Sequence, residues 1–397
     1  MKSGFHAVPA LARALFYAAL AVFPVSSALA DDEYDIQVIL PLTGPAAFLG
    51  KGEQQALQFA EKTVNDAGGI QGRPVKFIFH DDQTNPQVAV QLANDILASK
   101  PAVILGSSLV AVCRAMAPLM ADGPVMYCFS PGIHPDEGSY VFTASVSTLD
   151  LADAVIRYFR IKGWKKFALM FSTDATGQDA EKGIDALLQK PENKDIQIVE
   201  REHFNTTDVS VSAQIERIKA SKPQALIAWS TGAPIATIFR AIRQATLDVP
   251  VATTDGNMTY AQMTQYKDFL PRQLYIPAAQ WVVRDPTLLS PAVAAKSQMF
   301  YKAFEDNGAQ PDIASELGWE PGMLVIETLK KLGAGAGAAQ LRVALAQTKG
   351  YAGVNGVYDF TATPQRGLDV TDAVVTRWAP AKNIWEIVSK PTGIPLN

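Results

Sequence analysis

The stretch NDAGGIQGRP, which runs from Asn65 to Pro74, places three glycines and a proline between an apolar helix-like run and an apolar strand-like run. Glycines at such a point supply the left-handed backbone that ends a helix and turns the chain. A phosphate-binding loop has the opposite order, in which the strand comes first and the helix follows the glycines. The stretch therefore predicts a helix end and not a nucleotide site. GAGAGA at 333–338 also follows a helix-like run, so the same interpretation applies to it.

The chain begins with the pattern of an export signal. Lys2 and Arg13 precede or flank an apolar run over residues 14–25, and small residues ending in Ala28 and Ala30 come before Asp31. That run is shorter than the ~20 residues that a membrane span needs. The pattern predicts a signal peptide over residues 1–30, cleaved after Ala30, and hence a periplasmic protein.

Composition and charge favour a soluble two-domain protein that does not bind nucleic acid. The length of 397 residues exceeds what one core commonly supports. Loss of Lys2 and Arg13 with the signal segment reduces the 35 Lys and Arg to 33, against 39 Asp and Glu, for a net charge of −6. The longest basic cluster is the short KGWKK at 162–166, which is not the basic stripe that nucleic acid binding requires.

Strand and helix patterns alternate along the rest of the chain in two series. The first series runs over residues 35–130 and the second over residues 165–256, and in each an apolar strand is followed by a helix with apolar residues at helical spacing. Such alternation predicts parallel sheets with right-handed crossovers. The expected fold class is therefore α/β, with two similar doubly wound lobes.

The two cysteines, Cys113 and Cys128, allow two interpretations. In an oxidising compartment they can form one disulfide that closes a small loop. Alternatively they are two buried free thiols, one on a helix and one on the neighbouring strand. The separation of their Cα atoms decides between these, and the sequence does not give it.

A set of ordered motifs resembles a known family. LPLTGPAAFLG at 40–50 is followed by NDAGGIQGRPVKFIFHDDQTNPQVAVQLANDIL at 65–97, and then by ILGSS, AMAPL and VMYCFSPG. Their order and spacing resemble the periplasmic substrate-binding proteins of the leucine/isoleucine/valine-binding family of ABC importers, with weaker similarity as far as GVNGVYDFTATPQRG. The resemblance covers essentially the whole chain after the signal segment.

The resemblance implies the type I periplasmic-binding fold, in which two parallel-sheet lobes are joined by a hinge that the chain crosses three times. We expect the crossings near residues 145–149, 280–284 and 349–355. The N-terminal lobe would then consist of residues 31–147 plus 282–351, and the C-terminal lobe of residues 148–281 plus 352–397.

Ligand contacts of the family can be carried over position by position. The carboxylate-binding Ser of the family falls on Val110, its next contacts on Gly132 and His134, its aromatic residue on Thr176, and its ammonium-binding acid on Asp255. The aromatic residue of the first strand–helix turn falls on Phe48 or Leu49. Positions at the ends of predicted strands add Ser107, Ser108 and Trp229 to the candidate ligand-binding residues.

Several of these residues have an alternative structural role. Val110, Thr176 and His134 depart from the groups with which the family binds an α-amino acid, whereas Asp255 keeps an anion for an ammonium group. If His134 does not contact the ligand, it would be an ordinary surface histidine, and if Asp255 does not, it would cap the following helix. Likewise Ser107 and Ser108 can cap a helix and Trp229 can belong to the core.

The sequence favours a binding protein over an enzyme. No metal-ligand spacing links the histidines or cysteines, no G-x-S-x-G elbow is present, and we expect neither a cofactor nor a metal. A triad of Ser107, His134 and Asp255 rests on strand-end placement alone and is disfavoured. The expected function is that of the solute-binding component of an ABC importer. It would be a monomer that closes on a small amino acid-like or carboxylate ligand, aromatic acids included, and then docks on permease subunits. The alternatives are an exported ligand-sensing subunit and, less favoured, a periplasmic hydrolase.

Overall fold

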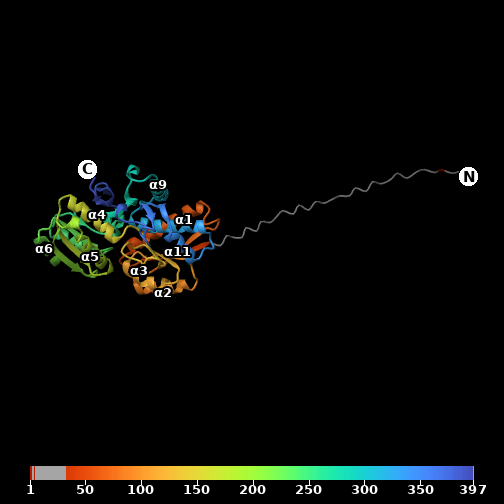
Figure 1. Ribbon diagram of the computed structural model, residues 1–397, viewed down its shortest axis with the longest axis horizontal. Helices are drawn as coiled ribbons and strands as arrows, with labels where there is room; N and C mark the ends of the chain where they lie inside the picture. Colours follow the sequence, from red (N-terminus) through yellow and green to blue (C-terminus); the bar gives the residue numbers. More distant parts are fainter. Residues whose placement is uncertain (2–3, 5–32, 397) are drawn as a thin grey trace.

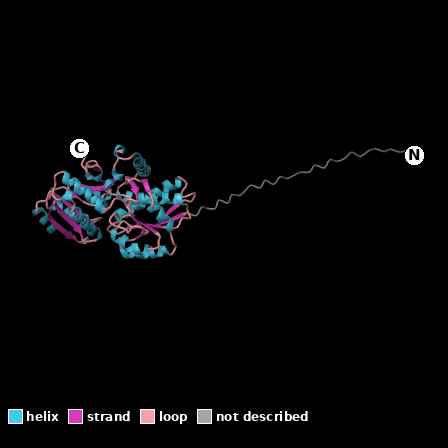
Figure 2. Cartoon of the chain, viewed as in Figure 1, coloured by secondary structure: helices cyan, strands magenta, loops and turns pink. Residues whose placement is uncertain are grey.

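The computed structural model describes Met1, Gly4 and residues 33–396. The predicted signal segment lies outside these residues apart from Met1 and Gly4. The described chain forms two α/β lobes that lie side by side, with α4, α5 and α6 on one lobe and α1, α2, α3 and α11 on the other (Figure 1). In each lobe the strands are flanked by helices (Figure 2).

The first lobe is built on a parallel five-stranded sheet with the order β2-β1-β3-β4-β5. Its strands are largely apolar and buried, as expected where helices cover both faces of a parallel sheet. The elements in chain order are β1 Tyr34–Leu40, α1 Ala47–Asp66, β2 Val75–Asp81, α2 Pro86–Leu97, β3 Val103–Gly106, α3 Val110–Met116, β4 Val125–Cys128 and β5 Val141–Thr143.

The second lobe is built on a seven-stranded sheet with the order β14-β13-β10-β9-β8-β6-β7. The strands from β7 to β10 are parallel, whereas β13 and β14 add an antiparallel edge. Its elements are α4 Thr148–Ile161, β6 Lys166–Ser172, α5 Ala175–Leu188, β7 Gln197–Phe204, α6 Ser212–Ala220, β8 Ala225–Trp229, α7 Ile235–Gln244, β9 Val251–Ala252, η3 Asp255–Asn257, α8 Tyr260–Gln265, β10 Leu274–Ala279, β13 Ala373–Ala379 and β14 Ile384–Ile387.

A third segment returns to the first lobe before the final strands. Its helix α10 packs along α1, and α11 contacts β4. The elements are α9 Pro291–Glu305, α10 Ile313–Leu332, α11 Ala338–Ala346, and the short hairpin of β11 Lys349–Ala352 and β12 Val357–Asp359.

The stretch Asn65–Pro74 ends α1 and turns the chain into β2, as the sequence predicts. Gly68, Gly69 and Gly72 all have positive φ. A side chain at Gly69 would also collide with the Arg73 carbonyl, because a Cβ there would lie 2.0 Å from its oxygen. The Asn65 side chain fixes the turn by accepting from the Val75 N–H at 2.7 Å and donating to the Val75 carbonyl at 2.8 Å. The glycines therefore serve the turn.

The chain passes between the sheets after β5, after β10 and after β12. The segment after β12 also contacts the first lobe, since the Thr143 N–H donates to the Gln365 carbonyl at 2.9 Å. Three passages agree with the expected connectivity of this fold. The exact residue limits of the two lobes stay a prediction.

Candidate functional site

A cleft lies between the lobes, at the edge where strands of both sheets end. Strands β3 and β4 of the first lobe and β8 and β9 of the second lead into it, which is where parallel α/β sheets hold ligands. In this arrangement the two walls lie close together, and the cleft holds a free volume of about 20 Å³, roughly the space of one water molecule. Its walls are formed by Leu49, Ser108, Leu109, Val110, Ser130, Pro131, Gly132, Thr148, Thr176, Trp229, Thr231, Thr254, Asp255, Gly256 and Leu317.

The cleft combines hydroxyl groups with an apolar wall. Serine and threonine side chains from both lobes line it, and Trp229, Leu49 and Leu317 supply apolar surface. Among these lining residues, Asp255 is the one with an ionisable side chain. The arrangement suits a small solute that has an apolar part and at least one polar end.

Asp255 has one satisfied and one unsatisfied carboxyl oxygen. Its Oδ1 accepts from the Thr254 hydroxyl at 2.8 Å and from the Gly256 N–H at 2.9 Å. Among the described residues, Oδ2 has no hydrogen-bond partner, although Asp255 is only 2% exposed. Burial raises the pKa of Asp255 to about 6, against the lowering effect of these hydrogen bonds. The carboxyl group therefore lines the cleft while it also holds its own turn.

Many of the predicted site residues come together in this cleft. The carboxyl ends of parallel strands share one edge of a sheet, so residues that follow β3, β4, β8 and β9 meet there. Thr176 joins them from the first turn of α5, where the capping Asp174 accepts from the Gly177 N–H at 3.0 Å. The predicted residues found in the cleft are Leu49, Ser108, Val110, Gly132, Thr176, Trp229 and Asp255.

Three predicted residues lie outside the cleft lining, namely Ser107, Phe48 and His134. Ser107 is fully buried, and its hydroxyl donates to Asp82 Oδ2 at 2.6 Å, so it fixes the loop after β2 instead of lining the cleft. Phe48 lines a separate hollow at the junction of the lobes with Lys51 and Gln55, so Leu49 is the residue of that turn that reaches the cleft.

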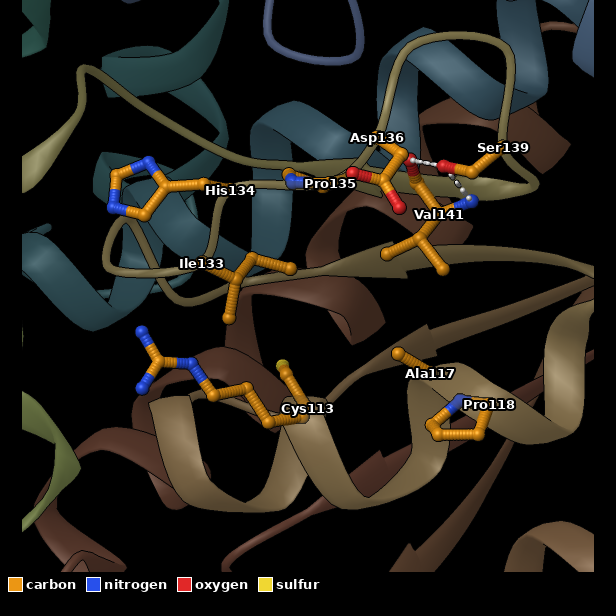
Figure 3. A pocket seen from close by; sticks show the side chains of 10 residues that line it. Cys113, Ala117, Pro118, Ile133, His134, Pro135, Asp136, Ser139 and Val141 are labelled. Atoms are coloured by element: carbon orange, nitrogen blue, oxygen red, sulfur yellow. Dashed lines mark hydrogen bonds between the residues drawn. The ribbon is translucent and has the colours of Figure 1, made fainter.

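His134 does not line this cleft in the structure, and its predicted ligand contact stays a prediction. Its neighbour Ile133 is buried in the first lobe, and the next side chain faces outward, 55% exposed. His134 stands on the wall opposite Cys113 in a surface hollow of the first lobe (Figure 3). Its Nε2 lies 2.9 Å from Asp179 Oδ1 on α5 of the second lobe. It therefore contacts the other lobe directly.

Cys113 and Cys128 form a disulfide in the structure, with 6.1 Å between their Cα atoms. The bond joins α3 to β4, the strand that leads to Ser130 and Gly132 in the cleft wall. Of the two interpretations that the sequence leaves open, the structure supports the disulfide.

Two buried carboxyl groups beside the cleft were missed at the level of sequence. Glu53 on α1 accepts from the hydroxyl of the lining residue Ser108, and burial raises the pKa of Glu53 to about 8. Glu316 on α10 accepts from the Asn355 side chain, and burial raises its pKa well above the usual value. A signal for Glu53 was present, because it lies on the apolar stripe of its helix with Ala56 and Leu57.

The lobes are in contact on both sides of the cleft. On one side Asp179 accepts from Arg114 Nη2 at 3.3 Å as well as pairing with His134. On another side the Ala233 N–H donates to the Pro45 carbonyl at 3.4 Å. These contacts join groups from different lobes, so the structure shows a closed arrangement.

Two specific alternatives, a metal site and a catalytic triad, can be checked against the described residues. Among them, no group of three or more His, Cys, Asp or Glu side chains is placed to hold a metal ion. Ser107, His134 and Asp255 each have other partners and do not form a triad. Within residues 33–396, no helix combines the length and apolar character needed to cross a membrane.

A family model and individual relatives of known name both match this chain, and they indicate the same family. The model of the family described as "Periplasmic binding protein" matches residues 33–383. The chain is 24% identical over 272 residues to the leucine-, isoleucine-, valine-, threonine- and alanine-binding protein of Pseudomonas aeruginosa, covering 64% of this chain and 68% of that protein. It is 32% identical over 111 residues to Leu/Ile/Val-binding protein homolog 3 of Brucella melitensis, covering 28% of this chain and 30% of that protein.

A solved structure extends the comparison to the whole fold. The branched-chain amino acid transporter substrate binding protein of Streptococcus pneumoniae, in complex with isoleucine, matches with a TM-score of 0.76 at 18% identity. The match covers 90% of this chain and 99% of that one. The two lobes and their connectivity are thus those of a known fold.

Proposed function

The chain belongs to the periplasmic binding protein family, and from this premise we propose that it is the extracytoplasmic solute-binding component of an ABC importer. It would hold a small amino acid-like solute between its lobes by hinge closure and present the closed form to permease subunits. Residues 1–30 would direct the chain to the periplasm. The names of the leucine-, isoleucine- and valine-binding relatives support a solute of this class.

The observation that carries the proposal is the cleft that both lobes build. Ser108, Val110 and Gly132 come from the first lobe, and Trp229 and Asp255 from the second. A solute that contacts both walls binds the closed arrangement better than the open one and so shifts the population toward closure. In this account Leu49, Trp229 and the cleft hydroxyls contact the ligand.

The test is a binding screen of protein that has been unfolded, dialysed and refolded to remove any retained solute. Melting temperatures are measured with amino acids, aromatic acids and amides, and hits are quantified by calorimetry. A ligand that prefers the native state raises the melting temperature, by mass action. We expect one solute class to bind and to be recovered chemically unchanged. Recovery of an altered compound, or no binding across the screen, would contradict the proposal.

A further inference from the structure

The buried carboxyl group of Asp255 lines the cleft, two further buried carboxyl groups lie next to lining residues, and each of the three has one oxygen without a partner. Asp255 belongs to the second lobe, whereas Glu53 on α1 and Glu316 on α10 belong to helices of the first. Among the described residues, Asp255 Oδ2, Glu316 Oε2 and Glu53 Oε1 are buried and lack a hydrogen-bond partner, as does Glu320 Oε1 one turn beyond Glu316. Buried carboxyl oxygens commonly accept a hydrogen bond. The lack of a donor at each of these oxygens therefore points to donors that the described chain does not supply.

The three groups are near one another. Leu317, next to Glu316, lines the cleft together with Asp255, and Ser108, which lines it too, donates to Glu53. Burial is the main cause of the raised pKa of Glu316, and the charges of Asp255 and Glu53 raise it further, an effect that requires them to be close by. Helix α10 also contacts η3, the turn that begins with Asp255.

The cleft lining supplies no positive side chain to balance these acids. None of its residues is Lys, Arg or His. The buried cation of this region, Arg366, donates to the carbonyls of Ser145 at 3.1 Å, Pro131 at 3.0 Å and Ile133 at 2.7 Å, so its N–H groups serve the backbone. A primary ammonium group has three donors and the complementary charge.

We propose that the cleft recognises a small apolar primary amine, whose ammonium group is shared by Asp255 and Glu316 from the two lobes, and that a carboxylate on the solute is dispensable. This inference rests on the proposed function and makes Glu316 a specificity-determining residue. It also gives a cause for closure, because two ionised carboxyl groups on opposite lobes repel one another until a cation lies between them.

The proposal sets the direction of pH dependence. The acidic groups that act on Glu316 are Asp255, Glu53 and Glu320, and Asp82 and Asp312 act on Glu53 in turn. Arg366 acts on Asp255 and favours its ionised form. Because the acids must be ionised to hold a cation, amine binding strengthens as the pH rises from 5 to 8.

The experiment uses matched solutes on two skeletons, with calorimetry on the full mature chain. Leucine is compared with isopentylamine and isocaproate, and phenylalanine with phenethylamine and hydrocinnamate. We expect at least one of the two amines to bind, its matched acid not to bind, and the affinity for that amine to rise between pH 5 and pH 8. In Glu316→Gln we expect amine affinity to fall at least about 30-fold, or ~2 kcal/mol at 1.4 kcal/mol per tenfold.

The matched control is Glu320→Gln, which neutralises a buried acid one turn further along α10. Glu320 accepts from the Val354 N–H at 3.0 Å and does not neighbour a cleft-lining residue, so the amine affinity of this variant should stay within about threefold of the wild type. Melting curves report whether each variant folds, and the pH series on the wild type needs no variant. The inference is overturned if a solute without an amine binds as tightly as the best amine, if amino acids bind but neither amine does, or if amine affinity is flat or falls with pH. Each of these three results leaves the proposed function intact. If no solute in the wider screen binds, both the inference and the proposed function fail.

Discussion

Asp179 offers a direct way to weaken the closed arrangement from a position outside the cleft lining. It lies on α5 of the second lobe and is 6% exposed, while its two partners on the first lobe are more open, Arg114 at 47% and His134 at 55%. Asp179→Ala removes both cross-lobe contacts. Exposed ion pairs contribute about 0.2–1 kcal/mol each, and hydrogen bonds to charged groups about 1.5–3 kcal/mol when buried.

The pair of contacts at this half-open site should therefore stabilise closure by about 1–2 kcal/mol in total. Asp179→Ala is then expected to shift the closed-to-open ratio by about 5–30-fold, and the apparent affinity for a ligand of the closed form to fall by up to the same factor. Energy transfer between dyes on the two lobes gives the ratio, and calorimetry gives the affinity.

Asp185→Ala is the matched control for this variant. Asp185 lies on the same helix but pairs with Arg201 of β7, so its ion pair stays within the second lobe. We expect the control to leave both the ratio and the affinity unchanged. If Asp179→Ala closes and binds like the wild type, or if the two variants behave alike, the reasoning about a cross-lobe contact is wrong.

Two further predictions concern the stability of the fold. The Cys113–Cys128 disulfide closes a loop with a sequence separation of 15, so the double variant Cys113→Ala/Cys128→Ala should lose about 3 kcal/mol of unfolding free energy in denaturant titrations, and an unchanged midpoint would contradict this. Burial raises the pKa of Glu53 to about 8 and that of Asp255 to about 6, from 4.5 and 3.8, so the folded chain binds more protons than the unfolded chain between about pH 4 and pH 8. Its unfolding free energy should then fall as the pH rises through this window, Glu53→Gln should flatten the slope, and a rise with pH in thermal melts would refute the assignment.

Much of the fold could be predicted from local patterns. The apolar strands, the helices between them and the glycine turn after Asp66 are short-range features, and the structure has them where the sequence indicates. The antiparallel edge of β13 and β14 was not predicted, because it depends on which strand a late segment meets in space. The local sequence of such a segment does not indicate which strand it will pair with.

The candidate site likewise contains residues that could be predicted from sequence and one that could not. Ser108, Gly132, Trp229 and Asp255 follow strands whose ends share an edge, so topology alone brings them into one cleft. That they bind a ligand stays a prediction. Glu316 could not be found from sequence, because it reaches this region only through the packing of α10 on α1, two helices far apart in the chain.

His134 shows the limit of carrying positions over from relatives. The loop that it follows is fixed by the carbonyl contacts of Arg366, a residue more than two hundred positions away. With Ile133 buried, the ring of His134 meets Asp179 on the opposite lobe and not the cleft. One residue of offset in such a loop changes which surface a side chain reaches.

The central claim is that two lobes close on a small solute, and small-angle X-ray scattering of the mature chain tests it most directly. The refolded, dialysed protein is measured alone and then at a saturating concentration of a solute that calorimetry has shown to bind. The account predicts a smaller radius of gyration with the solute, and a profile that then agrees with the closed arrangement described above. An identical radius in both samples, at proven saturation, would contradict it.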